Sequence, residues 1–172
     1  MSSNSSPEIK VLVGCLGMSS LRCTHRWNIC RSPMGEAVLK DIAQKRGLDI
    51  VVDSCGTAGY HVGEEPDERT VAVCKKHNVP IDSFARQVLT SDFVRFTHIL
   101  AADENNFRHL NSIKPSNSTA EVRLWGSYLD NKPIPDPYYG GVSGFEKIYQ
   151  QCVQLSNAFL DEVTSKDASS KS

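Results

Sequence analysis

The sequence predicts a single α/β domain in which a four-stranded parallel sheet carries helices on both faces. Short apolar segments alternate along the chain with segments of helical periodicity, the pattern of strands joined by helical crossovers. The first apolar segment, residues 9–14, is continuous, as expected for a central parallel strand buried on both faces. The chain has 172 residues, 40% of them hydrophobic, which suffices for one domain with a sizeable core.

The remaining elements have local signals of their own. A helix is expected to begin at Ser32 as N-cap, with Pro33 in the first helical position, and to close at Gly47. Asp103 reads as the N-cap of a short helix. The other expected elements are strands at residues 50–52, 97–102 and 121–125 and a helix at 67–77.

An apolar stripe of helical spacing predicts the last helix at residues 145–163. Residues 1–8 are rich in Ser, and residues 164–172 are rich in Ser and Lys. Both ends are expected to be flexible tails. The predicted domain therefore covers residues 9–163.

Composition excludes several classes of function. Nineteen Lys and Arg stand against twenty Asp and Glu without a like-charge block, so we expect no nucleic-acid or membrane partner. The apolar segments are too short to span a bilayer, and the N-terminus lacks a secretion signal. The cysteines are therefore expected to be reduced thiols in a cytoplasmic protein. They are Cys15, Cys23, Cys30, Cys55, Cys74 and Cys152.

Cys15 comes at the end of the first predicted strand, close to the start of the helix at Ser32. Ligands of parallel α/β sheets bind outside the carboxyl ends of the strands, and a helix N-terminus attracts anions. This placement predicts a small anion site at Cys15.

The surrounding motifs sharpen that prediction. Cys15-Leu16-Gly17 is followed, after residues 18–27, by Asn28-Ile29-Cys30-Arg31-Ser32-Pro33. The motifs that follow in order are Asp53-Ser54, Gly59-Tyr60, Pro66-Asp67, Ala85-Arg86-Gln87, Asp103-Glu104 and Asp136-Pro137-Tyr138-Tyr139. Together they resemble the low-molecular-weight protein tyrosine phosphatase family over roughly the whole predicted domain.

The resemblance implies a catalytic set that works without metal or organic cofactor. Cys15 would be the nucleophile, since a thiolate attacks the phosphate and a helix N-terminus lowers its pKa. Arg31 would bind two phosphate oxygens through its planar fork. Asp136, between Pro135 and Pro137, would be the general acid for the departing oxygen. The implied substrates are phosphotyrosine proteins and small aryl phosphates.

The resemblance also implies supporting roles. Leu16, Gly17, Asn28, Ile29, Cys30 and Ser32 would line the phosphate-binding loop, and Tyr60, Tyr138 and Tyr139 would form the walls for the substrate ring. Ser54 and His77 would hold Asn28, and Asp103 would brace the site. Cys30 would lie close enough to trap the nucleophile as a reversible disulfide.

The sequence departs from the family at one place. Residues 18–27 interrupt the loop, so fifteen residues separate Cys15 from Arg31 where the family has five. A short loop lets successive N–H groups converge on one anion, and an insertion breaks that succession. We therefore expect impaired hydrolysis. The alternative is an inactive phosphate-binding or interaction protein of the same fold.

Other interpretations of the sequence fit less well. Arsenate reductases of this fold need relay cysteines in the segment corresponding to residues 81–92, which has none. Phosphoarginine phosphatases usually carry Thr where this chain has Ile29. Cys23, His25 and Cys30 could be read as metal ligands, but their short spacing and the missing fourth ligand disfavour a metal site. Oligomeric state is not predicted.

Overall fold

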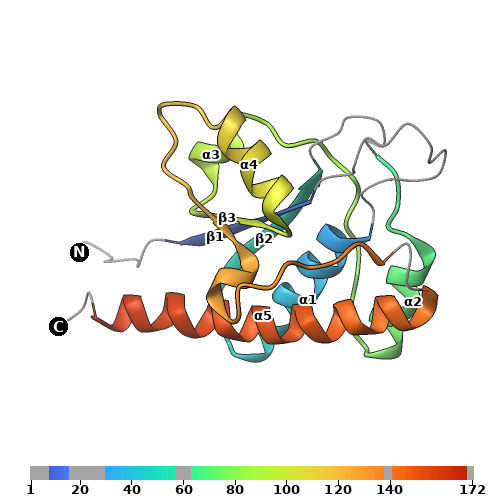
Figure 1. Cartoon of the computed structure of the whole chain (residues 1–172). Helices are drawn as coiled ribbons and strands as arrows, with labels where there is room; N and C mark the ends of the chain where they lie inside the picture. Colours follow the sequence, from blue (N-terminus) through green and yellow to red (C-terminus); the bar gives the residue numbers. More distant parts are fainter. Residues whose placement is uncertain (1–7, 16–29, 57–62, 138–140, 170–172) are drawn as a thin grey trace.

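The computed structural model describes residues 8–15, 30–56, 63–137 and 141–169 (Figure 1). Its strands are β1 (Ile9–Cys15), β2 (Ile50–Gly56), β3 (His98–Ala101) and β4 (Glu121–Leu124). Its helices are α1 (Arg31–Lys45), α2 (Glu68–Lys76), α3 (Asp92–Arg95), α4 (Glu104–Ile113), the 3-10 helix η2 (Trp125–Tyr128) and α5 (Gly141–Ser169).

The strands form one parallel sheet in the order β2-β1-β3-β4. Strand β1 lies between β2 and β3, so its backbone is hydrogen-bonded on both sides, and Val11 pairs with both Val52 and His98. The predicted four-stranded parallel sheet, with residues 9–14 in a central strand, is confirmed. Because all strands run the same way, the carboxyl ends of β1, β2 and β3 meet at one edge.

Helices cover both faces of this sheet, as predicted. Alternate residues of β1 face opposite sides. Val13 and Cys15 join the core formed with α1, α2 and α5, whereas Leu12 joins the smaller core formed with α3 and α4. In Figure 1 the long helix α5 runs below the sheet beside α1, and α3 and α4 lie above it.

The start of α1 differs from the prediction. The helix begins at Arg31, so Ser32 lies inside it and is not the N-cap. The Ser32 hydroxyl instead accepts a hydrogen bond from the thiol of Cys15. Among the described residues, the N-cap Cys30 forms no side-chain capping hydrogen bond. The other end is as expected, since Gly47 follows the helix with a φ of +68°, the left-handed conformation that glycine adopts without strain.

The last helix is longer than the predicted range 145–163. It runs from Gly141 to Ser169, so residues 164–169, expected to be part of a tail, continue the helix. An ion pair of 2.7 Å one turn apart, between Lys166 and Glu162, supports this extension. Helices α3 and η2 were not predicted, because each is a single turn. Within the described ranges, no helix has the length and apolar content needed to cross a membrane.

Candidate active site

Cys15 and Ser32 meet where β1 ends and α1 begins. Cys15 is the last residue of β1, and Ser32 lies in the first turn of α1. Both residues are buried, and the Cys15 thiol donates a hydrogen bond to Oγ of Ser32 over 3.1 Å. The same hydroxyl can donate to the sulfur once the thiol has lost its proton.

Arg31 is held in place beside this pair. Its Nη1 donates to Oδ2 of Asp103 over 2.7 Å and to the carbonyl oxygen of Ile134 over 2.9 Å. The arginine side chain is only 8% exposed. Oδ1 of Asp103 accepts a 2.9 Å hydrogen bond from the backbone N–H of Asn106 and so caps α4, as predicted. One carboxylate therefore fixes both a helix end and the guanidinium.

Opposing influences act on the Cys15 thiol. Burial raises its pKa, whereas the charge of Arg31 and the hydrogen bond with Ser32 lower it, with burial dominating among the described groups. The expected lowering of the Cys15 pKa therefore does not come from the described groups alone. The N–H groups expected to complete it belong to residues 16–29, outside the described ranges.

Cys30 has a different environment from Cys15. Burial, reinforced by the negative charge of Asp67, raises the pKa of Cys30 to about 12. Asp67 caps α2 and forms two ion-pairing hydrogen bonds with Arg69, which together hold the pKa of its carboxyl low. Cys30 is therefore a neutral thiol at physiological pH.

Asp136 lies on the segment that contacts Arg31 through the carbonyl oxygen of Ile134. Gln151 of α5 donates to the carbonyl oxygen of Pro133, and the N–H of Ile134 donates to the carbonyl oxygen of Ala102, each over 2.9 Å. The Asp136 side chain is exposed. Burial lowers the pKa of Arg31, but nearby negative charges, including that of Asp136, raise it overall. Asp136 thus lies within electrostatic reach of Arg31.

Ser54 and His77 have described partners other than the expected Asn28. Oγ of Ser54 donates to Glu36 of α1 over 2.5 Å. His77 lies 2.7 Å from Glu146 and stacks on the ring of Tyr149. Burial raises the pKa of Glu36, a residue that sequence reasoning missed, because a glutamate within a helix gives no signal that it is buried.

Several predicted site residues lie outside the described ranges. They are Leu16, Gly17, Asn28, Ile29, Tyr60, Tyr138 and Tyr139, together with the inserted residues 18–27 and the tail residues 1–7 and 170–172. In the part of the chain that the structure describes, no three His, Cys, Asp or Glu side chains are grouped to bind a metal ion.

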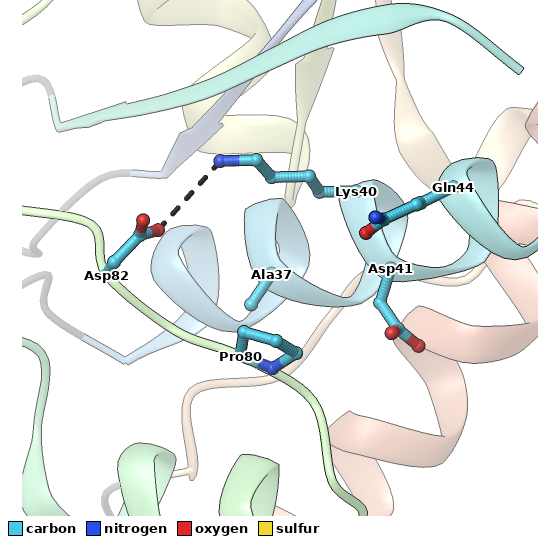
Figure 2. Close-up of a pocket in the computed structure, with 6 residues that line it drawn as sticks. All are labelled: Ala37, Lys40, Asp41, Gln44, Pro80 and Asp82. Atoms are coloured by element: carbon cyan, nitrogen blue, oxygen red, sulfur yellow. Dashed lines mark ion pairs between the residues drawn. The ribbon is translucent and has the colours of Figure 1, made fainter.

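A hollow on the surface lies along the middle turns of α1 (Figure 2). Across it Lys40 faces Asp82 at 3.9 Å, and both side chains are well exposed. Its other lining residues are Ala37, Asp41, Gln44 and Pro80. This hollow contains none of the residues around Cys15, and its lysine is paired, so it has no feature that selects a ligand.

Comparison with known proteins identifies the family. The family model described as low molecular weight phosphotyrosine protein phosphatase matches residues 23–169. The chain belongs to this family. The match of the phosphatase family model begins inside the insertion, after Cys15, so it does not cover that residue.

Relatives of this phosphatase chain span nearly its whole length. The low molecular weight phosphotyrosine protein phosphatases of Schizosaccharomyces pombe and Homo sapiens are 44% and 41% identical to it, over 90% and 88% of this chain and 97% and 94% of their own. A solved protein tyrosine phosphatase from Entamoeba histolytica, titled a product state mimic, is 30% identical with a TM-score of 0.81, covering 92% of this chain and 97% of its own.

Proposed function

We propose that this chain hydrolyses phosphotyrosine in proteins and small aryl phosphates through a phosphocysteine on Cys15. The observation that carries the proposal is the buried contact between Cys15 and Ser32 beside the clamped guanidinium of Arg31. A thiol at a strand end, facing a helix N-terminus and an arginine, is suited to attack a phosphate monoester.

The phosphate group would bind at the N-terminus of α1. Backbone N–H groups at that end carry partial positive charge, and the guanidinium of Arg31 matches two phosphate oxygens. Asp103 and Ile134 orient the guanidinium through Nη1, so little reorganisation is needed when the anion arrives. A lysine could supply the charge but not the paired geometry.

In the first chemical step, the Cys15 thiolate attacks phosphorus and the bond to the tyrosyl oxygen breaks. Asp136 donates its proton to the leaving oxygen, which departs as neutral phenol. Arg31 and the N–H groups of α1 stabilise the charge on the transferring phosphoryl group. The product of this step is phosphocysteine with Asp136 ionised.

In the second step, water attacks the phosphorus of the phosphocysteine. Asp136 accepts a proton from this water, the sulfur–phosphorus bond breaks, and inorganic phosphate leaves. The thiolate is restored, and the Ser32 hydroxyl donates to it. Each proton that Asp136 gives in the first step is returned in the second.

The remaining assignments follow the family resemblance. Leu16, Gly17, Asn28 and Ile29 would complete the phosphate loop with Cys30, and Tyr60, Tyr138 and Tyr139 would contact the aromatic ring. We also propose a cytoplasmic location, where the buried cysteines would remain reduced thiols.

We propose further that the insertion at residues 18–27 slows the reaction, because it separates N–H groups that must converge on one anion. The test compares the intact chain with a variant lacking residues 18–27 on para-nitrophenyl phosphate and a phosphotyrosine peptide. We expect hydrolysis by both and a far higher rate for the deletion variant. Cys15→Ser in each background is the control and should abolish turnover.

Absence of hydrolysis by both chains, with phosphate still bound, would replace this function by that of an inactive phosphate-binding protein. Equal rates would show that the insertion does not disturb the phosphate loop.

A further inference from the structure

Trp125 packs directly on the helix that carries Arg31. The tryptophan is fully buried, and the edge of its ring fills the place where a side chain at Gly35 would begin. A Cβ on Gly35 would lie 2.7 Å from Cζ3 of the ring and 3.1 Å from a methyl group of Val13. Gly35 follows Arg31 by one helical turn, so the contact lies on the Arg31 side of α1.

The next residue, Gly126, is equally constrained by the segment that leads to Asp136. A Cβ on Gly126 would lie 2.1 Å from the carbonyl oxygen of Lys132, a backbone atom that cannot move aside. The carbonyl oxygen of Gly126 accepts hydrogen bonds of 3.1 Å and 2.8 Å from the N–H groups of Leu129 and Asn131. The chain therefore reverses at Gly126 in a closed turn.

The two contacts converge on the same site. Beyond Lys132, the carbonyl oxygen of Ile134 accepts the hydrogen bond from Arg31, and Asp136 follows two residues later. Trp125 and Gly126 directly follow β4. Trp125 thus contacts the helix that carries Arg31, and Gly126 contacts the segment that leads to Asp136.

We propose that Trp125 and Gly126 are positioning residues that set the placement of Arg31 and Asp136 relative to each other. Core filling alone does not account for a tryptophan here, because its buried Nε1 has no hydrogen-bond partner among the described residues and such a donor is costly. A leucine would fill core space without that cost. The large flat ring instead provides a rigid contact against Gly35.

The first test changes the packing on α1 and then restores it. The methyl group of Gly35→Ala would overlap the ring of Trp125, and this clash would displace the first turn of α1. We expect kcat/KM on para-nitrophenyl phosphate to fall about tenfold and inhibition by inorganic phosphate to weaken. Trp125→Leu alone leaves Gly35 without its contact and should also lower kcat/KM. In the double variant the added methyl group packs against the smaller leucine side chain and closes the contact again, so it should recover most of both. Wild-type values in Gly35→Ala, or no recovery in the double variant, would overturn the proposal.

The second test separates Asp136 from Arg31. Gly126→Ala displaces Lys132, so hydrolysis of phenyl phosphate, whose leaving group needs protonation, should fall more than hydrolysis of para-nitrophenyl phosphate. Asp130→Ala removes the hydrogen bond that its carboxylate accepts from the N–H of Lys132 over 3.1 Å, and so loosens the same turn without a clash. It should give a smaller selective loss, which keeps the test open if Gly126→Ala does not fold. Equal losses with both esters in the folded variants would contradict the positioning of Asp136.

A matched control separates positioning from stability. Leu160→Ala opens a cavity in the same core, on α5. It should lower Tm without changing kcat/KM or the ratio between the two esters. A shift of that ratio by Leu160→Ala would show that loss of stability alone explains the effects, and would overturn the proposal.

The kinetic readouts rest on the proposed function, so one measurement is independent of turnover. The rate of Cys15 alkylation by iodoacetate depends on the placement of Ser32 and Arg31 around the thiol. Gly35→Ala should slow alkylation even if neither the intact chain nor the deletion variant hydrolyses any ester. Loss of hydrolysis alone would then refute the proposed function, whereas an unchanged alkylation rate would refute the positioning role.

Discussion

The two arginines at opposite ends of α1 have contrasting surroundings. Arg31 begins the helix, is almost fully buried, and is bonded to Asp103 and Ile134. Arg46 caps the other end, is about a third exposed, and pairs with Asp161 over 2.7 Å. Both form an ion pair of the same length, so contact distance alone does not distinguish them.

The physical difference lies in the helix dipole and in burial. A cation at a helix C-terminus is favoured by the macrodipole, so Arg46 stabilises α1 where it stands. Arg31 is a cation at the positive end and also loses its hydration, and the partnership with Asp103 offsets that cost only in part. Folding does not need a cation at this end, whereas binding of an anion does. This contrast is the basis for our proposal that Arg31 serves anion binding, whereas Arg46 stabilises the helix.

The largest expected effect is that of Arg31→Lys, which keeps the charge and removes the planar fork. We expect kcat/KM on aryl phosphates to fall by about a hundredfold or more and phosphate inhibition to weaken. Steady-state kinetics of the deletion variant, where the rate is highest, is the measurement. Arg46→Lys is the matched control and should leave both parameters unchanged. A comparable loss in Arg46→Lys would remove the distinction between the two ends.

Asp103→Asn should lower both activity and stability. It keeps a hydrogen-bond acceptor for Arg31 but removes the charge of the carboxylate that pairs with the buried guanidinium, at a cost on the order of 2 kcal/mol in the free energy of unfolding. Denaturant unfolding measures it. Asp161→Asn, which removes the counter-charge of Arg46, should cost only about 0.5 kcal/mol. Equal costs would mean that the two arginines are held alike.

Ser32→Ala tests the thiol through its pH dependence. The hydrogen bond with Ser32 lowers the pKa of Cys15, so its loss should raise that pKa and reduce the thiolate fraction at a given pH. Iodoacetate alkylation near neutral pH should therefore slow a few-fold. The two rates should converge at pH values above both pKa values, where both thiols are ionised. A constant ratio across pH would instead indicate altered access to the thiol.

The smallest expected effect is that of Arg46→Met. An exposed ion pair and a favourable dipole contact together contribute less than about 1 kcal/mol to stability. The difference from wild type in the unfolding midpoint should shrink at high salt, because screening weakens exposed charges. A salt-independent loss would show that Arg46 acts mainly through its hydrogen bond to Asn157 rather than through its charge.

The fold was largely predictable because its signals are local. Continuous apolar strands and amphipathic helices determine the sheet, and Asp103 and Asp67 cap helices by the usual short-range rule. The rule failed at Ser32, because its hydroxyl is hydrogen-bonded to Cys15, which is distant along the chain. Sequence patterns describe neighbours along a helix and do not reveal which distant group competes for a side chain.

The site was predictable only in part. The placement of Arg31 beside Asp103 joins residues far apart in the sequence, and the family resemblance alone suggested it. The buried Glu36 and the contact of Trp125 with Gly35 had no sequence signal, because both depend on the packing of α1 against the sheet. Such contacts are set by tertiary geometry rather than by spacing along the chain.

The central claim is that Cys15 carries the phosphoryl group although fifteen residues separate it from Arg31. Its most direct test mixes the intact chain and the deletion variant with para-nitrophenyl phosphate, quenches the reaction in acid, and maps the phosphorylated residue by mass spectrometry. The account predicts phosphate on Cys15 in both chains, with more of it formed early in the deletion variant. Phosphate on Cys30, or no covalent phosphate in either chain, would contradict it.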